Sequence, residues 1–303
     1  MKNFLSIESC TKESLVSLVN SAELLKEARV CGDFSDNSLK NQCWGIIFSK
    51  ASTRTRVSFE VGIRELGGSA LFLSPKDLQL GRGEPIKDTA RVMGRMLHGA
   101  IIRNDSQVEV ESFAEFSKIP TINALTDMEH PCQIIADLLT IKEIQGTWDD
   151  KKIVFLGDVN CNVAHSWVWA AERLGFELIL TGPSEICNPL EYLKKVGSTK
   201  AHYVDNPIEA VSGANVLYTD VWVSMGMEDQ ASERDGHFNA YQINQQLTSI
   251  ADSDVMVMHC LPAYREKEIS ETVFEENAET IFSQAENRLH AQKAIMKSLV
   301  STN

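Results

Sequence analysis

The sequence predicts an α/β fold made of two doubly wound parallel-sheet domains that are linked by two interdomain helices. Short apolar runs of strand length alternate along the whole chain with stretches of helical spacing, which is the pattern of βαβ units. A length of 303 residues suggests two domains of ordinary size. The turn-rich sequence GTWDD at 146–150 is the best break near mid-chain, so we place the domain boundary there.

The elements of the first domain, expected over 1–145, follow from this alternation. The apolar runs predict strands at Trp44–Phe48, Ala70–Leu73, Ala100–Ile102 and Thr121–Ala124. The segments between and after them predict helices near 55–66, 86–96, 107–117 and 131–145.

The second domain, expected over 146–284, continues in the same style. Its predicted strands are Ile153–Leu156, Glu177–Leu180, Ala201–Val204, Val216–Thr219 and Val255–His259. The acidic stretch 228–235 is interpreted as a long loop. Apolar residues at helical spacing, with Gln292 as the one polar gap, predict a last helix over 285–300. We expect residues 285–303 to complete the first domain, so that this helix and the helix 131–145 link the two domains.

The composition excludes several classes of protein. A formal charge of −13 makes the chain a poor binder of nucleic acid and of anionic membranes. The seven cysteines include no C-x-x-C pair, which argues against a zinc ribbon, and their odd number argues against a secreted disulfide framework. No apolar run is long enough to span a membrane, and the first residues carry no signal-peptide core. We therefore expect a soluble, cytoplasmic protein.

Polar residues that follow the predicted strands are the candidate site, because ligands of open parallel sheets bind at the strand carboxyl ends. The sequence Ser52-Thr53-Arg54-Thr55 follows the first strand and opens a helix. Helix N–H groups, hydroxyls and a guanidinium together suit an anion such as phosphate. Ordinary helix capping explains one such hydroxyl, but it explains this whole cluster less well in so acidic a chain.

Three further residues are individually ambiguous. Arg103 ends the third strand, where an ordinary surface ion pair explains it equally well. His130 and Gln133 lie at the start of a helix that Pro131 pre-organises, and can hydrogen-bond a ligand there or merely cap the helix.

In the second domain, Gly157 is the only glycine of the turn after the first strand, so the dinucleotide-binding pattern G-x-G-x-x-G is absent. Asn160 and Asn162 instead offer neutral donors and acceptors to a zwitterion. Asp220 follows another strand and can hold an ammonium group or cap a turn. Cys260 lies at a strand end, where a thiol is well placed to meet a substrate, although an inert core thiol is the commoner case.

Taken together, these motifs resemble the aspartate/ornithine carbamoyltransferase family, and within it the ornithine branch. The matching segments run in order through the chain: SKASTRTRVSFE, LQLGRGEPIKDTARV, IIR, HPCQ, GDxxxN, DVWVSMG, HCLP and ENRLHAQKA. The resemblance implies transfer of the carbamoyl group of carbamoyl phosphate to the δ-amine of L-ornithine, giving L-citrulline and phosphate. A carbamoyltransferase acting on another amine, such as putrescine or acetylornithine, is the alternative.

The resemblance also implies roles for individual residues. The residues implied to bind carbamoyl phosphate are Ser52, Thr53, Arg54, Thr55, Gln79, Arg103, His130, Gln133, Cys260, Leu261 and Arg288. Those implied to bind ornithine are Asn162, Asp220, Ser224 and Met225. Arg103 and Cys260 are implied to be catalytic, with Cys260 and Leu261 at the δ-amine.

Partners follow from the same resemblance. It implies a homotrimer in which Gln79 reaches into the site of a neighbouring subunit. It implies no metal and no organic cofactor, because carbamoyl phosphate is already an activated donor. Two other classes fit parts of the pattern: a nucleotide-linked oxidoreductase, which the missing glycine fingerprint disfavours, and a non-catalytic carbamoyltransferase-like binding protein.

Overall fold

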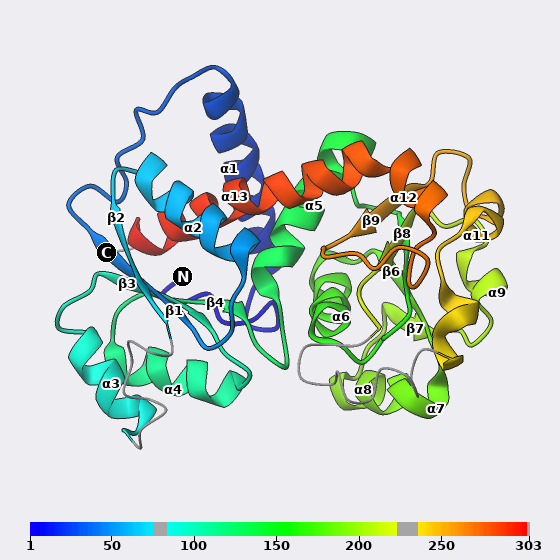
Figure 1. Ribbon diagram of the computed structural model, residues 1–303, viewed down its shortest axis with the longest axis horizontal. Helices are drawn as coiled ribbons and strands as arrows, with labels where there is room; N and C mark the ends of the chain where they lie inside the picture. The colour runs from blue at the N-terminus through cyan, green and yellow to red at the C-terminus, as the bar shows by residue number, and fades with distance from the viewer. Residues whose placement is uncertain (75–83, 223–235, 302–303) are drawn as a thin grey trace. The chain divides into compact units, whose positions relative to one another are not determined.

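The computed structural model describes residues 1–74, 84–222 and 236–301, and the chain divides into two compact units. The first unit comprises Met1–Leu139 and Glu286–Asn303, and the second comprises Thr140–Ala285. Each unit is built around a parallel sheet with helices, so the predicted fold class is confirmed (Figure 1).

The first unit contains all four strands and all four helices that the sequence predicts there, with ends shifted by a few residues. Its elements are α1 (Lys12–Val30), β1 (Cys43–Phe48), α2 (Thr53–Glu65), β2 (Ser69–Leu73), α3 (Ile86–Met93), β3 (Gly99–Arg103), α4 (Gln107–Ser117) and β4 (Thr121–Leu125), with parts of α5 (Pro131–Gln145) and α13 (Ala278–Val300).

Two helices differ from the prediction. Helix α1 is not among the predicted helices; it begins with a reciprocal capping box formed by Thr11 and Ser14. The last helix, α13, begins at Ala278 rather than at 285. Although both are long, neither they nor any other helix in the described ranges is apolar enough to cross a membrane.

The strand order of the first unit indicates where a sheet of this kind would bind a ligand. Within the described part of this unit the sheet has the order β2-β1-β3-β4, and every pair is parallel. Strand β2 is added on one side of β1, and β3 is added on the other side. The topological switch point, where the order of strand addition reverses, therefore lies between β1 and β3. Phe48 pairs with Arg103, so these two strands end at the same level. In Figure 1, α2 and the end of α13 lie on one side of this sheet, and α3 and α4 on the other.

The second unit contains the five predicted strands. Its elements are β5 (Lys152–Leu156), α6 (Asn162–Leu174), β6 (Glu177–Thr181), α7 (Ser184–Cys187), α8 (Pro189–Val196), β7 (Ala201–Tyr203), α9 (Pro207–Val211), β8 (Val216–Thr219), a 3-10 turn (Asn239–Tyr241), α11 (Gln245–Ile250), β9 (Met256–His259) and α12 (Glu271–Glu276). The predicted loop 228–235 lies outside the described residues.

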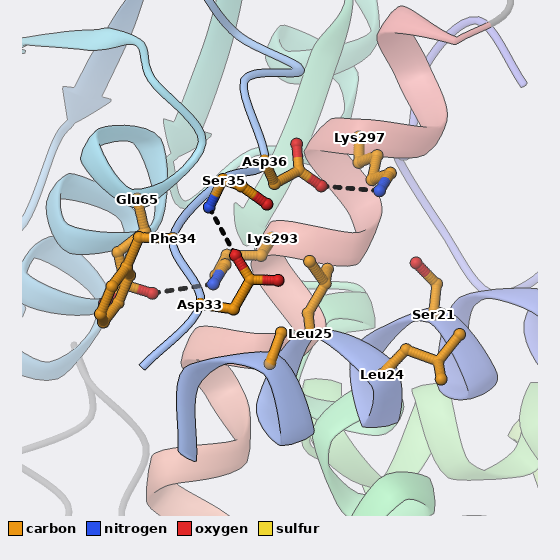
Figure 2. Close-up of a pocket in the computed structure, with 11 residues that line it drawn as sticks. Ser21, Leu24, Leu25, Asp33, Phe34, Ser35, Asp36, Glu65, Lys293 and Lys297 are labelled. Atoms are coloured by element: carbon orange, nitrogen blue, oxygen red, sulfur yellow. Dashed lines mark hydrogen bonds and ion pairs between the residues drawn. The ribbon is translucent and has the colours of Figure 1, made fainter. Parts of the chain in front are cut away.

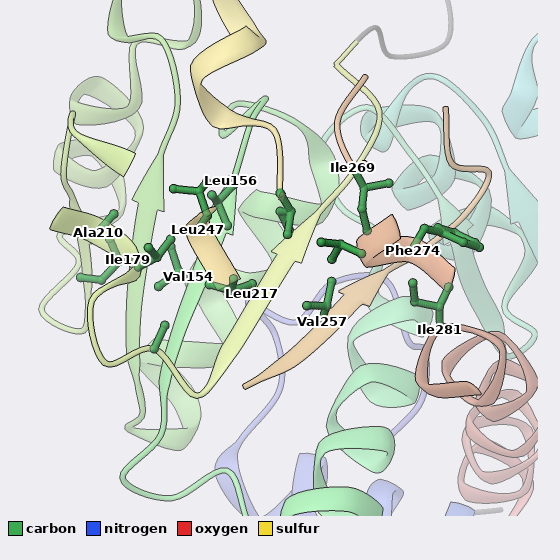
Figure 3. Packing of buried hydrophobic residues seen from close by; sticks show 14 residues of the cluster. Val154, Leu156, Ile179, Ala210, Leu217, Leu247, Val257, Ile269, Phe274 and Ile281 are labelled. Atoms are coloured by element: carbon green, nitrogen blue, oxygen red, sulfur yellow. The ribbon is translucent and has the colours of Figure 1, made fainter. Parts of the chain in front are cut away.

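The second sheet also has a switch point. Among the described residues its order is β7-β6-β5-β8-β9, all parallel, which places the switch between β5 and β8. Thr219 pairs with both Leu156 and His259, so β5, β8 and β9 end side by side. One face packs against α9, α11 and α12 through a buried apolar cluster that includes Leu217, Leu247 and Phe274 (Figure 3).

Candidate active site

The start of α2 is built to receive an anion. Ser52 precedes the helix with extended backbone (φ −153°, ψ 106°), and its side chain does not cap the helix. Its hydroxyl instead donates to Thr55 Oγ1 at 3.0 Å. The N–H groups of this first turn therefore remain available to a negatively charged ligand. Ser49, just after β1, donates its N–H and O–H to the carbonyl of Arg103 at 2.8 and 3.1 Å, which joins the ends of β1 and β3.

A chain of hydrogen bonds joins three helices at this point. Arg288 on α13 donates from Nη2 to Thr55 Oγ1 and from Nη1 to Gln133 Oε1, both at 2.9 Å. Gln133 on α5 donates from Nε2 to Asp137 Oδ1 at 2.8 Å. All four side chains belong to buried residues. We call this chain, Asp137–Gln133–Arg288–Thr55, the amide relay.

The electrostatics of the first unit also favour an anion. Burial, together with the neighbouring charges of Arg288 and Arg54, lowers the pKa of Arg103 to about 10, and Asp105 only partly opposes the shift. Arg103 is therefore still charged at neutral pH. Neighbouring positive charges of this kind repel one another, and a bound dianion such as a phosphate group relieves that repulsion.

His130 is neutral in this surrounding. Burial, and then the charges of Arg288 and Arg103, hold the pKa of His130 well below its usual range. A neutral imidazole can donate one hydrogen bond to a carbonyl oxygen without adding charge. The next residue but one, Cys132, has a structural role, since burial raises the pKa of its thiol to about 12 and its Sγ donates to Asn123 O at 3.4 Å.

The first unit thus brings together most of the residues that the sequence predicts there. Ser52, Thr55, Gln133 and Arg288 are linked by hydrogen bonds, and Arg54, Arg103, His130 and Arg288 are linked by the charge effects just given. Thr53 and Arg54 lie exposed in the first turn of α2. Gln79 lies outside the described residues.

Sequence reasoning missed two buried carboxylates near these residues. One is Asp137 of the amide relay, whose spacing of four from Gln133 on one helix was a usable signal. The other is Glu129, directly before His130, which accepts the N–H groups of Ile7 and Glu8 at 2.8 and 3.4 Å. Glu129 thereby ties the N-terminal segment to the loop that presents His130.

In the second unit, the turn after β5 is shaped by packing. Gly157 has φ +108°, and a Cβ there would lie 2.9 Å from Trp222 Nε1, so the glycine serves close packing rather than a dinucleotide. Cys161 caps α6, with Sγ accepting from Ala164 N at 3.5 Å. Burial, and the carboxylates of Asp220 and Asp158, hold the pKa of Cys161 well above its usual range. The ends of β5 and β8 therefore converge around this thiol, with Asn162 next to it as the first residue of α6.

A second cluster lies at the ends of β8 and β9. Atoms that could coordinate a metal ion, one each from Asp220, His259 and Cys260, lie within 4.8 Å of one another. His259 Nε2 donates to buried Glu268 at 3.0 Å, and its Nδ1 accepts from Leu261 N at 2.9 Å. A cation held by all three would have to displace one of these two hydrogen bonds.

The structure therefore places Asp220, Cys260 and Leu261 close together, although the resemblance assigns Asp220 to the α-amino and α-carboxylate groups of ornithine and Cys260 and Leu261 to its δ-amine. Leu261 has left-handed backbone (φ +60°), which its hydrogen bond to His259 holds in place. Ser224 and Met225 lie outside the described residues.

A separate cavity of about 270 Å³ lies in the first unit and contains none of the predicted site residues. It is lined by α1, the segment 33–36 and α13 (Figure 2). Both lysines that line it form ion pairs with carboxylates: Lys293 with Glu65 at 2.8 Å and Lys297 with Asp36 at 2.6 Å. These pairs tie α2 and the segment before β1 to α13.

Comparison with known proteins shows which family the chain belongs to. The family model described as "Aspartate/ornithine carbamoyltransferase, carbamoyl-P binding domain" matches residues 2–143, and the "Asp/Orn binding domain" of the same family matches residues 149–299. The chain belongs to the aspartate/ornithine carbamoyltransferase family. The resemblance that the sequence motifs indicated is thereby confirmed.

Similar members of this family span the same length as the chain. An ornithine carbamoyltransferase of Akkermansia muciniphila is 54% identical over 99% of this chain and 98% of its own, and one of Methanosphaera stadtmanae is 50% identical over 98% of each. The solved ornithine carbamoyltransferase of Pyrococcus furiosus matches with a TM-score of 0.91 at 38% identity, covering 100% and 98% of the two chains. The anabolic enzyme of Campylobacter jejuni matches with a TM-score of 0.91 at 40% identity, covering 100% of both.

Proposed function

We propose that this protein is an ornithine carbamoyltransferase, which transfers the carbamoyl group of carbamoyl phosphate to the δ-amine of L-ornithine. The observation that carries the proposal is the cluster of Arg54, Arg103 and Arg288 at the switch point of the first sheet, in which Arg103 and Arg288 also act on a neutral His130. This set suits a phosphate group next to a carbonyl. The names of the similar proteins support the same reaction.

The first unit would hold and activate carbamoyl phosphate. Its phosphate would be bound by Arg54, by the hydroxyls at the start of α2 and by Arg288. Attack on the carbonyl carbon creates an oxyanion, and each well-aimed donor stabilises such a charge by about 3–4 kcal/mol. Arg103, neutral His130 and Thr55 are the donors for this oxygen. Phosphate then leaves with its charge balanced by the arginines.

The second unit would hold ornithine. Asn162 and Asp220, with Ser224 and Met225, would bind its α-amino and α-carboxylate groups. The δ-amine attacks only as the neutral amine, and with a free pKa of about 10.4 only about one molecule in 10³ is neutral at pH 7. Cys260 would accept or steer the proton that the amine loses.

An assay of four amines tests this function. Ornithine, putrescine, acetylornithine and aspartate are each incubated with carbamoyl phosphate, and the ureido product is measured colorimetrically. Citrulline from ornithine, at a kcat/KM well above that of the other amines, is the expected result. Preference for another amine would reassign the substrate. If none of the four amines gave a product, the protein would instead be a non-catalytic binding protein.

We also propose a cytoplasmic homotrimer that serves arginine biosynthesis and in which Gln79 completes the site of a neighbouring subunit. A mixture of Gln79→Ala and Arg54→Ala subunits, dissociated and reassembled, tests the shared site. Hybrid trimers should regain activity, because some sites then carry neither defect. Proven subunit exchange with no recovery would refute the sharing.

A further inference from the structure

We propose that Asp137 is a positioning residue, which fixes the orientation of the Gln133 amide and thereby holds Arg288 in place for carbamoyl phosphate. This inference rests on the proposed function. Asp137 is fully buried and accepts a hydrogen bond from Gln133 Nε2 at 2.8 Å, so it can act on Arg288 through the Gln133 amide.

The chemistry of the two neighbours of Gln133 determines which way its amide faces. Asp137 as a carboxylate only accepts hydrogen bonds, and the guanidinium of Arg288 only donates them. Gln133 therefore presents its NH₂ group to Asp137 Oδ1 at 2.8 Å and its carbonyl oxygen to Arg288 Nη1 at 2.9 Å. A spacing of four residues on α5 places Asp137 one helical turn after Gln133, which is the separation at which such side chains meet.

Loss of the Asp137 carboxylate would remove one of the two hydrogen bonds that select this orientation and would leave the buried Nε2 group without this acceptor, so the amide would be held less firmly. A glutamine amide has nearly the same shape after a half turn, so only its hydrogen bonds select one orientation. In the turned orientation Nε2 would face Arg288 Nη1, donor against donor. Arg288 would then keep its hydrogen bond to Thr55 but lose the one to Gln133.

The consequence for binding follows from the burial of the relay. Gln133 is 1% exposed and Arg288 5% exposed, so water has little access to replace a lost partner. An unsatisfied buried donor typically weakens an equilibrium by about one order of magnitude, and we expect a loss of about tenfold in carbamoyl-phosphate affinity. Binding of ornithine in the second unit should not depend directly on Asp137.

The test is a double-mutant cycle on the intact oligomer, read by calorimetric titration with carbamoyl phosphate. Asp137→Leu keeps the branching of the side chain but removes the acceptor. Gln133→Met keeps the length of its side chain but removes the amide. Asp137→Asn keeps an acceptor oxygen and serves as the milder variant should the leucine variant not fold. Leu138→Ala, at the next buried position of α5, controls for general loss of packing.

We expect Asp137→Leu to raise the Kd for carbamoyl phosphate about tenfold and Asp137→Asn to raise it about threefold, since a neutral acceptor binds the amide more weakly. In the Gln133→Met background, either change should have almost no further effect, because the amide it orients is gone. Leu138→Ala should lower the melting temperature and leave the Kd unchanged.

Three results would overturn the proposal: an unchanged Kd in both Asp137 variants, effects of Asp137 and Gln133 that simply multiply, or an equal loss of affinity in Leu138→Ala. Wild-type protein that binds no carbamoyl phosphate and forms no citrulline would instead refute the proposed function. The two failures are therefore distinguishable.

Discussion

Two arginines on the first turns of α2 have different roles. Arg54 is exposed at the start of the helix, and its charge contributes to lowering the pKa of Arg103. Arg56, two residues later, pairs with Glu60 at 2.7 Å and lies 3.8 Å above the ring of Phe72. Arg54 is therefore the one suited to a ligand, and Arg56 supports the fold.

Arg54→Ala should weaken carbamoyl-phosphate binding by about 2–5 kcal/mol, because the phosphate loses a forked, charged partner. Arg56→Ala is the matched control and should change the affinity by less than about threefold, since its contacts lie within the protein. Calorimetric titration measures both. Near-normal affinity in Arg54→Ala, or equal losses in the two variants, would remove Arg54 from the site.

At this scale the sequence predicts the residue types but not their contacts. Polar residues at the ends of Trp44–Phe48 and Val255–His259 are visible as motifs because parallel strands place them at one sheet edge. The amide relay is not visible in this way. Arg288 reaches Gln133 across 155 positions and Thr55 across 233, and only the packing of α13 brings them together.

Among the helices, α1 and α13 were hard to predict for a physical reason. In α1, exposed Leu24 and Val30 add to the buried apolar residues, so no clean stripe marks one face. In α13 only the first turns, 278–284, were missed, because exposed Phe282 and buried Gln284 interrupt the apolar spacing there. The strands were easier, because buried parallel strands are continuous apolar runs.

The loop before α5 depends on Glu129, whose carboxylate anchors the backbone of the N-terminal segment. Hydrogen bonds to a buried charged group contribute about 1.5–3 kcal/mol, so Glu129→Gln should lower the free energy of unfolding by about that amount. Glu115→Gln, an exposed residue of α4, is the control and should change it by less than about 0.5 kcal/mol. Urea denaturation measures both, and equal stability of the two variants would contradict the anchoring role of Glu129.

The last helix makes the fold sensitive to acid. Burial lowers the pKa of His290 to about 4, although Glu286 opposes the shift and Lys293 and Lys26 favour it. The unfolded chain binds this proton near the ordinary value of 6.5, so the unfolded state holds more protons between about pH 6.5 and pH 4. The free energy of unfolding therefore falls as the pH drops through this window.

His290→Gln should reduce this dependence of the melting temperature between about pH 6.5 and pH 5, where few carboxylates titrate. Calorimetric melting of wild type and variant at closely spaced pH values measures how the melting temperature depends on pH. A variant that keeps the full wild-type slope would show that another group is responsible.

For the whole molecule, the proposed function assigns the two substrates to different units, and this predicts an order of binding. Ornithine is a cation at its side chain, and the first unit carries the positive charges of Arg103, Arg288 and Arg54. A bound carbamoyl phosphate neutralises that charge. We therefore expect weak or undetectable ornithine binding to the free protein, and clear binding once carbamoyl phosphate or a bisubstrate mimic is present.

Isothermal calorimetry with ornithine, with and without the mimic, measures this coupling. The mimic should also raise the melting temperature, because it binds only the folded state. Tight one-to-one binding of ornithine that no phosphate-side ligand alters would show that the two sets of residues are independent.

The most direct test of the account follows the carbamoyl carbon itself. Carbamoyl phosphate labelled with ¹³C at this carbon is mixed with ornithine and the protein, and NMR follows the label while released phosphate is measured in parallel. We expect the label to appear in the ureido carbon of citrulline, with one phosphate released for each citrulline formed. Release of phosphate without labelled citrulline, or no consumption of carbamoyl phosphate at all, would contradict it.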